Sequence, residues 1–154
     1  SGTVAAALEA AFLGRMGLAV SINSRAPRNN QTAALLGARV AGDMLGNPEM
    51  FGSGNSPLVL NLNVPDLPLD EVRGILVGRQ ALTERETEIA INDDEQDFDG
   101  EFDTGEFVLD SRAVAAGYVA VTPLQVDLTN YDRIKALRVW SRSWTFPAKN
   151  REIT

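Results

Sequence analysis

The sequence contains neither cysteine nor histidine, and these two absences exclude whole classes of chemistry. Without histidine the chain cannot hold a Ser-His-Asp triad, an imidazole general base or a histidine-ligated zinc ion. Without cysteine it cannot form disulfides, thiolate nucleophiles or cysteine-ligated iron–sulfur clusters. Any catalysis must therefore use hydroxyls, carboxylates, backbone amides, lysine or arginine, or a hard metal held by oxygen ligands.

Positive charge and long apolar runs are also scarce. The 154 residues include 14 Lys and Arg against 21 Asp and Glu, which gives a formal net charge of −7. Such an acidic chain is not expected to bind nucleic acid, which requires clustered basic residues. No stretch reaches the roughly 20 apolar residues of a membrane span, because Glu9 and Arg15 interrupt the run over 4–18. No signal-peptide pattern precedes that run, so we expect a cytoplasmic protein without a membrane partner.

The first half of the chain alternates predicted helices and buried strands. Apolar residues at helical spacing predict helices over 1–17 and 30–45, the first rich in alanine and ended by glycines. Nearly continuous apolar runs predict buried strands over 17–23 and 57–65. This order, with short connections, predicts an α/β fold in which helices cover a parallel sheet.

The second half has more strand-like patterns. They cover residues 74–80, 87–92, 106–110 and 117–129. The second and third flank an acidic loop and are expected to be the two arms of a hairpin. A final helix is expected after Thr129, which forms a capping-box-like start with Asp132. We therefore expect a β-rich extension with a C-terminal arm suited to packing on another copy.

The Ser1-Gly2-Thr3 run stands at the start of the first predicted helix and has three readings. Ser1 or Thr3 can be an ordinary N-cap, which is the routine role of these residues. Alternatively, the backbone amides and the helix dipole bind a phosphate there, with glycine permitting close approach. Thirdly, Ser1 can be a nucleophile that uses its own amine as base, although such enzymes carry that nucleophile on a strand. Arg25 and Arg28, near the second helix, are expected to be solvated.

An acidic loop spans residues 93–106. Its acidic members are Asp93, Asp94, Glu95, Asp97, Asp99, Glu101, Asp103 and Glu106. Glu95, Asp97 and Asp99 followed by Gly100 approximate a calcium loop of the EF-hand type. The strand-like flanks favour a solvated hairpin tip instead, and an incidental calcium site stays open as the alternative.

Three stretches, in order, resemble the SurE family of metal-dependent nucleotidases and acid phosphatases. The resemblance rests on SGTVAAALEAAFLG with LAVSIN, on LVLNLNVPDLPLDEVRGILVGRQ, and on GYVAVTPLQVDLTNYDRIKAL. It is weaker over 24–56 and 81–116. The resemblance implies that residues 1–73 belong to a Rossmann-like core. It also implies that residues 74–154 form a hairpin extension and a C-terminal arm, through which a homo-oligomer, a dimer or tetramer, assembles.

The resemblance also implies an activity: divalent-metal-dependent removal of phosphate from nucleoside 5′- or 3′-monophosphates, with Mg²⁺ or Mn²⁺ as the metal. In that family a Ser-Gly-Thr run binds the phosphate beside the metal, and it maps onto Ser1, Gly2 and Thr3. This mapping makes phosphate binding the favoured reading of the run. Backbone amides and hydroxyls there would hold the phosphoryl oxygens.

The family's metal ligands precede that run, in a strand ending in Thr-Asn-Asp-Asp-Gly and in further segments. Asn92-Asp93-Asp94 matches this motif by letters only, because it follows the run and Glu95 replaces the glycine. We therefore assign no metal ligand and no catalytic residue in this chain, and expect the ligands from a missing N-terminal half. The chain is expected to be the C-terminal part of a phosphatase, inactive alone. The alternative is a non-catalytic oligomerisation or interaction module derived from the SurE fold.

Overall fold

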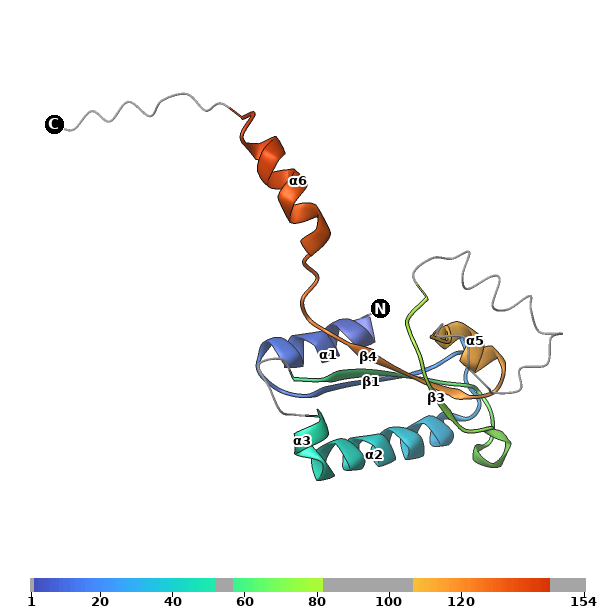
Figure 1. Ribbon diagram of the computed structural model, residues 1–154. Helices are drawn as coiled ribbons and strands as arrows, with labels where there is room; N and C mark the ends of the chain where they lie inside the picture. Colours follow the sequence, from blue (N-terminus) through green and yellow to red (C-terminus); the bar gives the residue numbers. More distant parts are fainter. Residues whose placement is uncertain (1, 52–56, 82–106, 145–154) are drawn as a thin grey trace.

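The structure is a computed structural model, and it describes residues 2–51, 57–81 and 107–144. Its elements in chain order are helix α1 (Gly2–Phe12), strand β1 (Gly17–Ile22), helices α2 (Asn30–Gly46) and α3 (Pro48–Phe51), strand β2 (Val59–Val64), the 3₁₀ helix η1 (Leu69–Glu71), strand β3 (Ile75–Val77), helix α5 (Asp110–Ala115), strand β4 (Val119–Leu124) and helix α6 (Tyr131–Ser141). The helices and strands predicted for the first half are therefore confirmed, with small differences at their ends. Figure 1 shows helices on both faces of one sheet, with α6 standing away from it.

The four strands form one sheet in the order β1-β2-β4-β3. β1 and β2 are parallel, with Gly17 opposite Val59 and Ile22 opposite Val64. β4 is antiparallel to β2 and parallel to β3, so the sheet is mixed rather than parallel throughout as expected. The reason is the connection from β2 to β3, which contains only the short η1 helix. A parallel return needs a crossover of about a dozen residues or more, usually a full helix.

Different helices cover the two faces of the sheet. α2 and α3 lie on one face, and α1 and α5 lie on the other (Figure 1). The predicted helical spacing of apolar residues in α2 is confirmed, since Ala33 and Met44 are buried in the core and the partly buried Leu36 and Val40 pack against it. α1 approaches β1 so closely that a Cβ atom at Gly17 would clash with the carbonyl oxygen of Ala7. The small side chains of Ala7, Ala11 and Ala19 fill this contact.

The predicted hairpin arm over 106–110 is wrong in its described part. Leu109 forms a single bridge with Arg79, and Asp110 begins helix α5. With six residues, α5 is too short for a helical period to be recognised in the sequence. The other predicted arm, 87–92, lies outside the described residues.

Two further predictions in the second half need smaller corrections. The strand predicted over 74–80 is shorter, since β3 covers only Ile75–Val77. The final helix is confirmed, but its N-cap is Asn130 rather than Thr129, because the Asn130 side chain accepts a hydrogen bond from the Arg133 backbone N–H at 3.2 Å. Asparagine ranks above threonine at this position.

The described residues form the mixed α/β sheet with flanking helices that the fold class anticipates. The division of the chain at residue 73 stays a prediction, and the sheet takes two strands from each side of it. In the part of the chain that the structure describes, no helix combines the length and the apolar character needed to cross a membrane.

Candidate functional site

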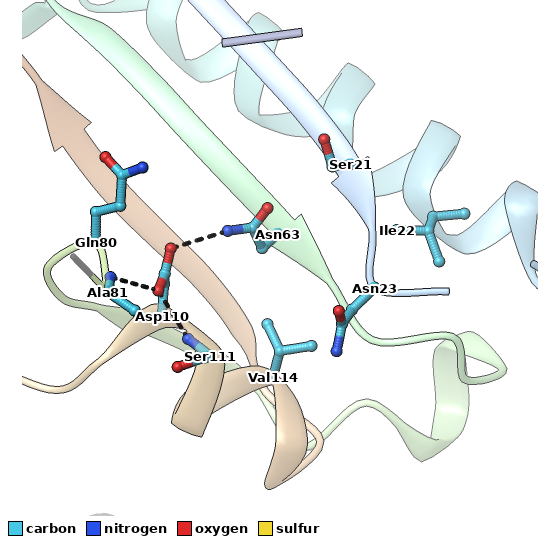
Figure 2. A pocket seen from close by; sticks show the side chains of 9 residues that line it. All are labelled: Ser21, Ile22, Asn23, Asn63, Gln80, Ala81, Asp110, Ser111 and Val114. Carbon is cyan, nitrogen blue, oxygen red and sulfur yellow. Dashed lines mark hydrogen bonds between the residues drawn. The ribbon is translucent and has the colours of Figure 1, made fainter. Parts of the chain in front are cut away.

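A polar pocket lies where β1 and β2 end. It has a volume of about 340 Å³. Its lining residues are Ser21, Ile22, Asn23, Asn63, Gln80, Ala81, Asp110, Ser111 and Val114. The carboxyl ends of parallel strands are the usual ligand-binding edge of an open α/β sheet, because the chain leaves the sheet there and exposes loop and side-chain groups. Figure 2 shows that these residues come from β1, β2, the segment after β3 and α5, with Asn63, Asp110 and Ser111 close together and the Ile22 side chain turned away.

The buried carboxylate of Asp110 organises one wall of this pocket. Asp110 is only 8% exposed. Its Oδ1 atom accepts hydrogen bonds from the backbone N–H of Ser111 at 2.8 Å and of Ala81 at 3.0 Å. Its Oδ2 atom accepts one from Asn63 Nδ2 at 3.2 Å. These hydrogen bonds join the start of α5, the segment after β3 and the end of β2 through one carboxylate.

The floor of the pocket comes from Ser21 and Asn63, which are directly opposite in the β1–β2 register. Because side chains alternate along a strand, both lie on the face of the sheet that carries α1 and α5. Asn63 uses its Nδ2 for Asp110, and Figure 2 shows its Oδ1 turned away from that carboxylate. Among the described residues this Oδ1 has no hydrogen-bond partner. The pocket therefore offers an unused acceptor beside a hydroxyl.

Gly2 and Thr3 form the exposed first turn of α1, and Ser1 lies outside the described residues. α1 is joined to β1 by a short turn, so it runs antiparallel to β1 and its N-terminus faces the end of the sheet where β1 finishes. Figure 1 shows this N-terminus directed toward α5. The structure thus brings Gly2 and Thr3 to the same end of the sheet as the polar pocket, although neither of them lines it.

A second carboxylate, Asp66, holds the loops that follow β1 and β2 together. It accepts hydrogen bonds from the backbone N–H groups of Arg28 at 3.0 Å and of Asn29 at 2.8 Å, and from Asn29 Nδ2 at 3.1 Å. These hydrogen bonds, that of the Asn29 backbone foremost, lower the pKa of Asp66 below its ordinary value. The carboxylate therefore holds Asn29, the N-cap residue of α2, and the residue before it. The side chain of Arg28 is exposed, as is that of Arg25.

The described residues do not fit a divalent metal centre. No three His, Cys, Asp or Glu side chains within 2–51, 57–81 and 107–144 lie close enough together to hold a metal ion. The buried Asp110 is occupied by three N–H donors rather than open to a cation. The candidate calcium loop over 93–106 lies outside the described residues and stays a prediction.

Sequence reasoning did not single out Ser21, Asn63 or Asp110. One signal was available for Asn63, because β2 reads VLNLNV and asparagine is depleted in strands and rarely buried. Two asparagines in an otherwise apolar strand indicate polar partners on one face of the sheet. No local pattern identified Asp110, whose partner Asn63 is 47 positions away in the sequence.

Comparison with known proteins agrees with this architecture. The model of a family described as "Survival protein SurE" matches residues 1–87, which is more than half of the chain. The chain is also similar to a crystal structure of the SurE protein from Aquifex aeolicus, with a TM-score of 0.63 and 25% sequence identity. That match covers 92% of this chain but only 58% of the Aquifex chain. Together with the mixed α/β sheet, these matches establish that the chain belongs to the SurE family.

Proposed function

We propose that this chain provides the phosphate-binding part of a phosphomonoesterase that releases phosphate from nucleoside 5′- or 3′-monophosphates. Membership of the SurE family supports a phosphatase or nucleotidase function at the level of the family. The observation that carries the proposal is the position of the Gly2–Thr3 turn. It starts α1 at the same end of the sheet as a pocket lined mainly by neutral polar side chains.

The first turn of α1 suits a phosphoryl group chemically. The N–H groups of a first turn have no partner within the helix, and the helix dipole favours an anion there. α1 carries no acidic residue in its first turn that would repel one. A Cβ atom at Gly2 would meet nothing within 4 Å, so a ligand has room to approach the backbone. In the proposed complex these amides and the Thr3 hydroxyl donate to the phosphoryl oxygens, with Ser1 adding a further hydroxyl.

The proposed activity includes the dependence on Mg²⁺ or Mn²⁺ that the family resemblance implies. Because the described residues do not fit a metal centre, the ligands would have to come from elsewhere. A polypeptide carrying the family's Thr-Asn-Asp-Asp-Gly strand is the natural source. The contribution of this chain is then to bind and orient the phosphomonoester.

Phosphate release tests the activity. The chain is assayed alone and together with a polypeptide that carries the Thr-Asn-Asp-Asp-Gly strand, using nucleoside 5′- and 3′-monophosphates with Mg²⁺ or Mn²⁺. We expect release only in the combined sample. No release from any nucleoside monophosphate or general phosphatase substrate would contradict the proposal.

The role of Thr3 is tested separately by binding of inorganic phosphate. Thr3→Ala removes one hydroxyl and should weaken binding about fivefold, the net value of one hydrogen bond. Nuclear magnetic resonance titration that follows the amides of residues 2–4 measures this change. Thr129→Ala, before α6, is the matched control and should bind phosphate as the wild type does. Unchanged binding of phosphate by Thr3→Ala would contradict a phosphate-binding role for Thr3 and leave it as an N-cap residue.

A second candidate function is a non-catalytic oligomerisation module. The observation that favours it is α6, which has no buried residue and stands away from the sheet (Figure 1). Leu137, Val139 and Trp140 on this helix are all more than half exposed. Such an apolar helix fits packing against a second copy in a dimer or tetramer. The hairpin proposed to join this assembly lies outside the described residues.

A further inference from the structure

We infer that the pocket at the ends of β1 and β2 binds the sugar hydroxyls of the phosphomonoester, with Asn63 Oδ1 as the acceptor and Asp110 as the positioning residue that fixes its orientation. This inference rests on the proposed function, which identifies the ligand as a nucleoside monophosphate. It places the sugar of that ligand in a pocket separate from the phosphate site at the start of α1.

Asp110 sets the direction of the Asn63 amide. An asparagine amide has one face that donates and one that accepts, and either can point at a neighbour. A carboxylate can only accept, so Asp110 Oδ2 requires the donating Nδ2 of Asn63, at 3.2 Å. The Asn63 Oδ1 atom must then face the other way, as Figure 2 shows. The buried carboxylate of Asp110 therefore leaves Asn63 Oδ1 as a hydrogen-bond acceptor inside the pocket.

Asp110 is itself held by the main chain. Its Oδ1 accepts two backbone N–H groups, from Ser111 at 2.8 Å and Ala81 at 3.0 Å. Backbone groups cannot exchange donor for acceptor as an amide side chain can. The carboxylate is thus fixed by the main chain of two segments, and the amide of Asn63 is fixed by the carboxylate.

The lining of the pocket suits an uncharged ligand group that carries hydroxyls. None of its nine described lining residues is Lys or Arg, so the pocket suits an uncharged part of a ligand rather than the phosphate. Asn63 Oδ1 requires a donor, and Ser21 beside it can donate or accept. A sugar hydroxyl satisfies both groups. The volume of about 340 Å³ is ample for one sugar ring.

The test measures binding of inorganic phosphate, uridine 5′-monophosphate and its 2′-fluoro-2′-deoxy and 3′-fluoro-3′-deoxy analogues by calorimetry and by resonance titration. Fluorine keeps the size of the hydroxyl but cannot donate a hydrogen bond. For the wild type we expect at least one analogue to bind about tenfold more weakly than uridine monophosphate. Equal binding of all three nucleotides would overturn the inference.

Asp110→Asn tests the positioning role. The new side chain keeps its oxygen on the two backbone N–H groups and presents its Nδ2 to Asn63, so the Asn63 amide turns over and offers Nδ2 to the ligand. The tenfold preference for hydroxyl over fluorine should fall to near one, while binding of inorganic phosphate is unchanged. An unchanged preference for hydroxyl over fluorine would show that Asp110 does not fix the orientation of the Asn63 amide. Asp132→Asn, the same change on the distant helix α6, should leave every affinity unaltered.

Ser21→Ala keeps the test valid if Asp110→Asn does not fold. It should weaken the binding of uridine monophosphate several-fold without affecting the binding of inorganic phosphate.

The experiments distinguish failure of the phosphate site from failure of the sugar pocket. Phosphate binding near residues 2–4 without any response at Ser21 or Asn63 to the nucleotide would overturn the sugar pocket alone. A hydroxyl-dependent response at Asn63 without phosphate binding near residues 2–4 would overturn the phosphate site alone, and no binding of either kind would overturn both.

Discussion

At the scale of single residues, the face of the sheet between α1 and α5 carries an unusual polar pair. Asn61 on β2 lies opposite Thr122 on β4, and the two residues are only 4% and 2% exposed. Asn61 Oδ1 and Thr122 Oγ1 are fully enclosed, and neither has a hydrogen-bond partner in the described part of the chain. An enclosed polar atom without a partner costs about 1–3 kcal/mol of stability.

Replacing Thr122 by valine removes this cost while keeping the shape of the side chain. We expect Thr122→Val to raise the free energy of unfolding by about 1 kcal/mol, as measured by urea denaturation at an unchanged m value. Thr32→Val is the matched comparison, because Thr32 is equally buried but its Oγ1 donates to the Leu67 carbonyl at 2.9 Å. That variant should lose about 1 kcal/mol. Equal destabilisation of both variants would show that the Thr122 hydroxyl is satisfied.

At the scale of elements, two carboxylates accept backbone N–H groups at the starts of helices, one from within its helix and one from a distant loop. Asp110 lies in the first turn of α5, and Asp66 reaches α2 from a loop that follows β2. Each accepts one backbone N–H group that a helix start leaves without a partner, from Ser111 for Asp110 and from Asn29 for Asp66. α2 could be predicted from its apolar stripe, yet no side chain of its own caps it. The residue that accepts from the N-cap amide of α2 is Asp66, 37 positions away from Asn29, so it could not be predicted from the local sequence.

Asp66 makes the stability of this arrangement depend on pH. Its pKa in the folded chain is lowered, chiefly by the Asn29 backbone hydrogen bond, so its contribution is complete above the ordinary pKa of aspartate. That contribution is lost as the pH falls through the lowered pKa. Asp66→Asn should therefore lower Tm at neutral pH, and the difference from the wild type should vanish in strong acid.

Thermal unfolding followed from about pH 7 to about pH 2 measures this effect. Asp70→Asn, at an exposed position on η1, serves as the control and should change Tm little at any pH. A gap between wild type and Asp66→Asn that stays constant across the whole range would mean that ionisation of Asp66 is irrelevant to folding.

At the scale of the whole molecule, the described residues divide into a packed sheet and a separate helix. The apolar clusters of the core take residues from α1, α2, α5 and all four strands, but none from α6. Trp140 on α6 packs edge-to-face with Trp144, with ring centroids 5.1 Å apart, and it is 56% exposed. An exposed helix of this kind adds little to the stability of one copy and offers an apolar surface to another.

Deletion of residues 130–154 tests the proposed assembly. If α6 holds a dimer or tetramer together, light scattering should show a mass that drops to that of a single chain. The Tm of the remaining sheet, extrapolated to low protein concentration, should change little, because α6 has no buried residue. A mass that is unaffected by the deletion would contradict the role of the arm and with it the oligomerisation module.

The sequence by itself determined the classes of chemistry that are absent, the positions of α1, β1, α2, β2 and α6, and the resemblance to the SurE family. These conclusions rest on composition and on periods of two or 3.6 residues, which short segments carry within themselves. Only the tertiary structure decided that β4 runs antiparallel to β2, that residues 110–115 form a helix, and that Ser21, Asn63 and Asp110 share one pocket. Pairing between distant segments leaves no local period, so the direction of a strand and the orientation of one amide become visible only once the chain is packed.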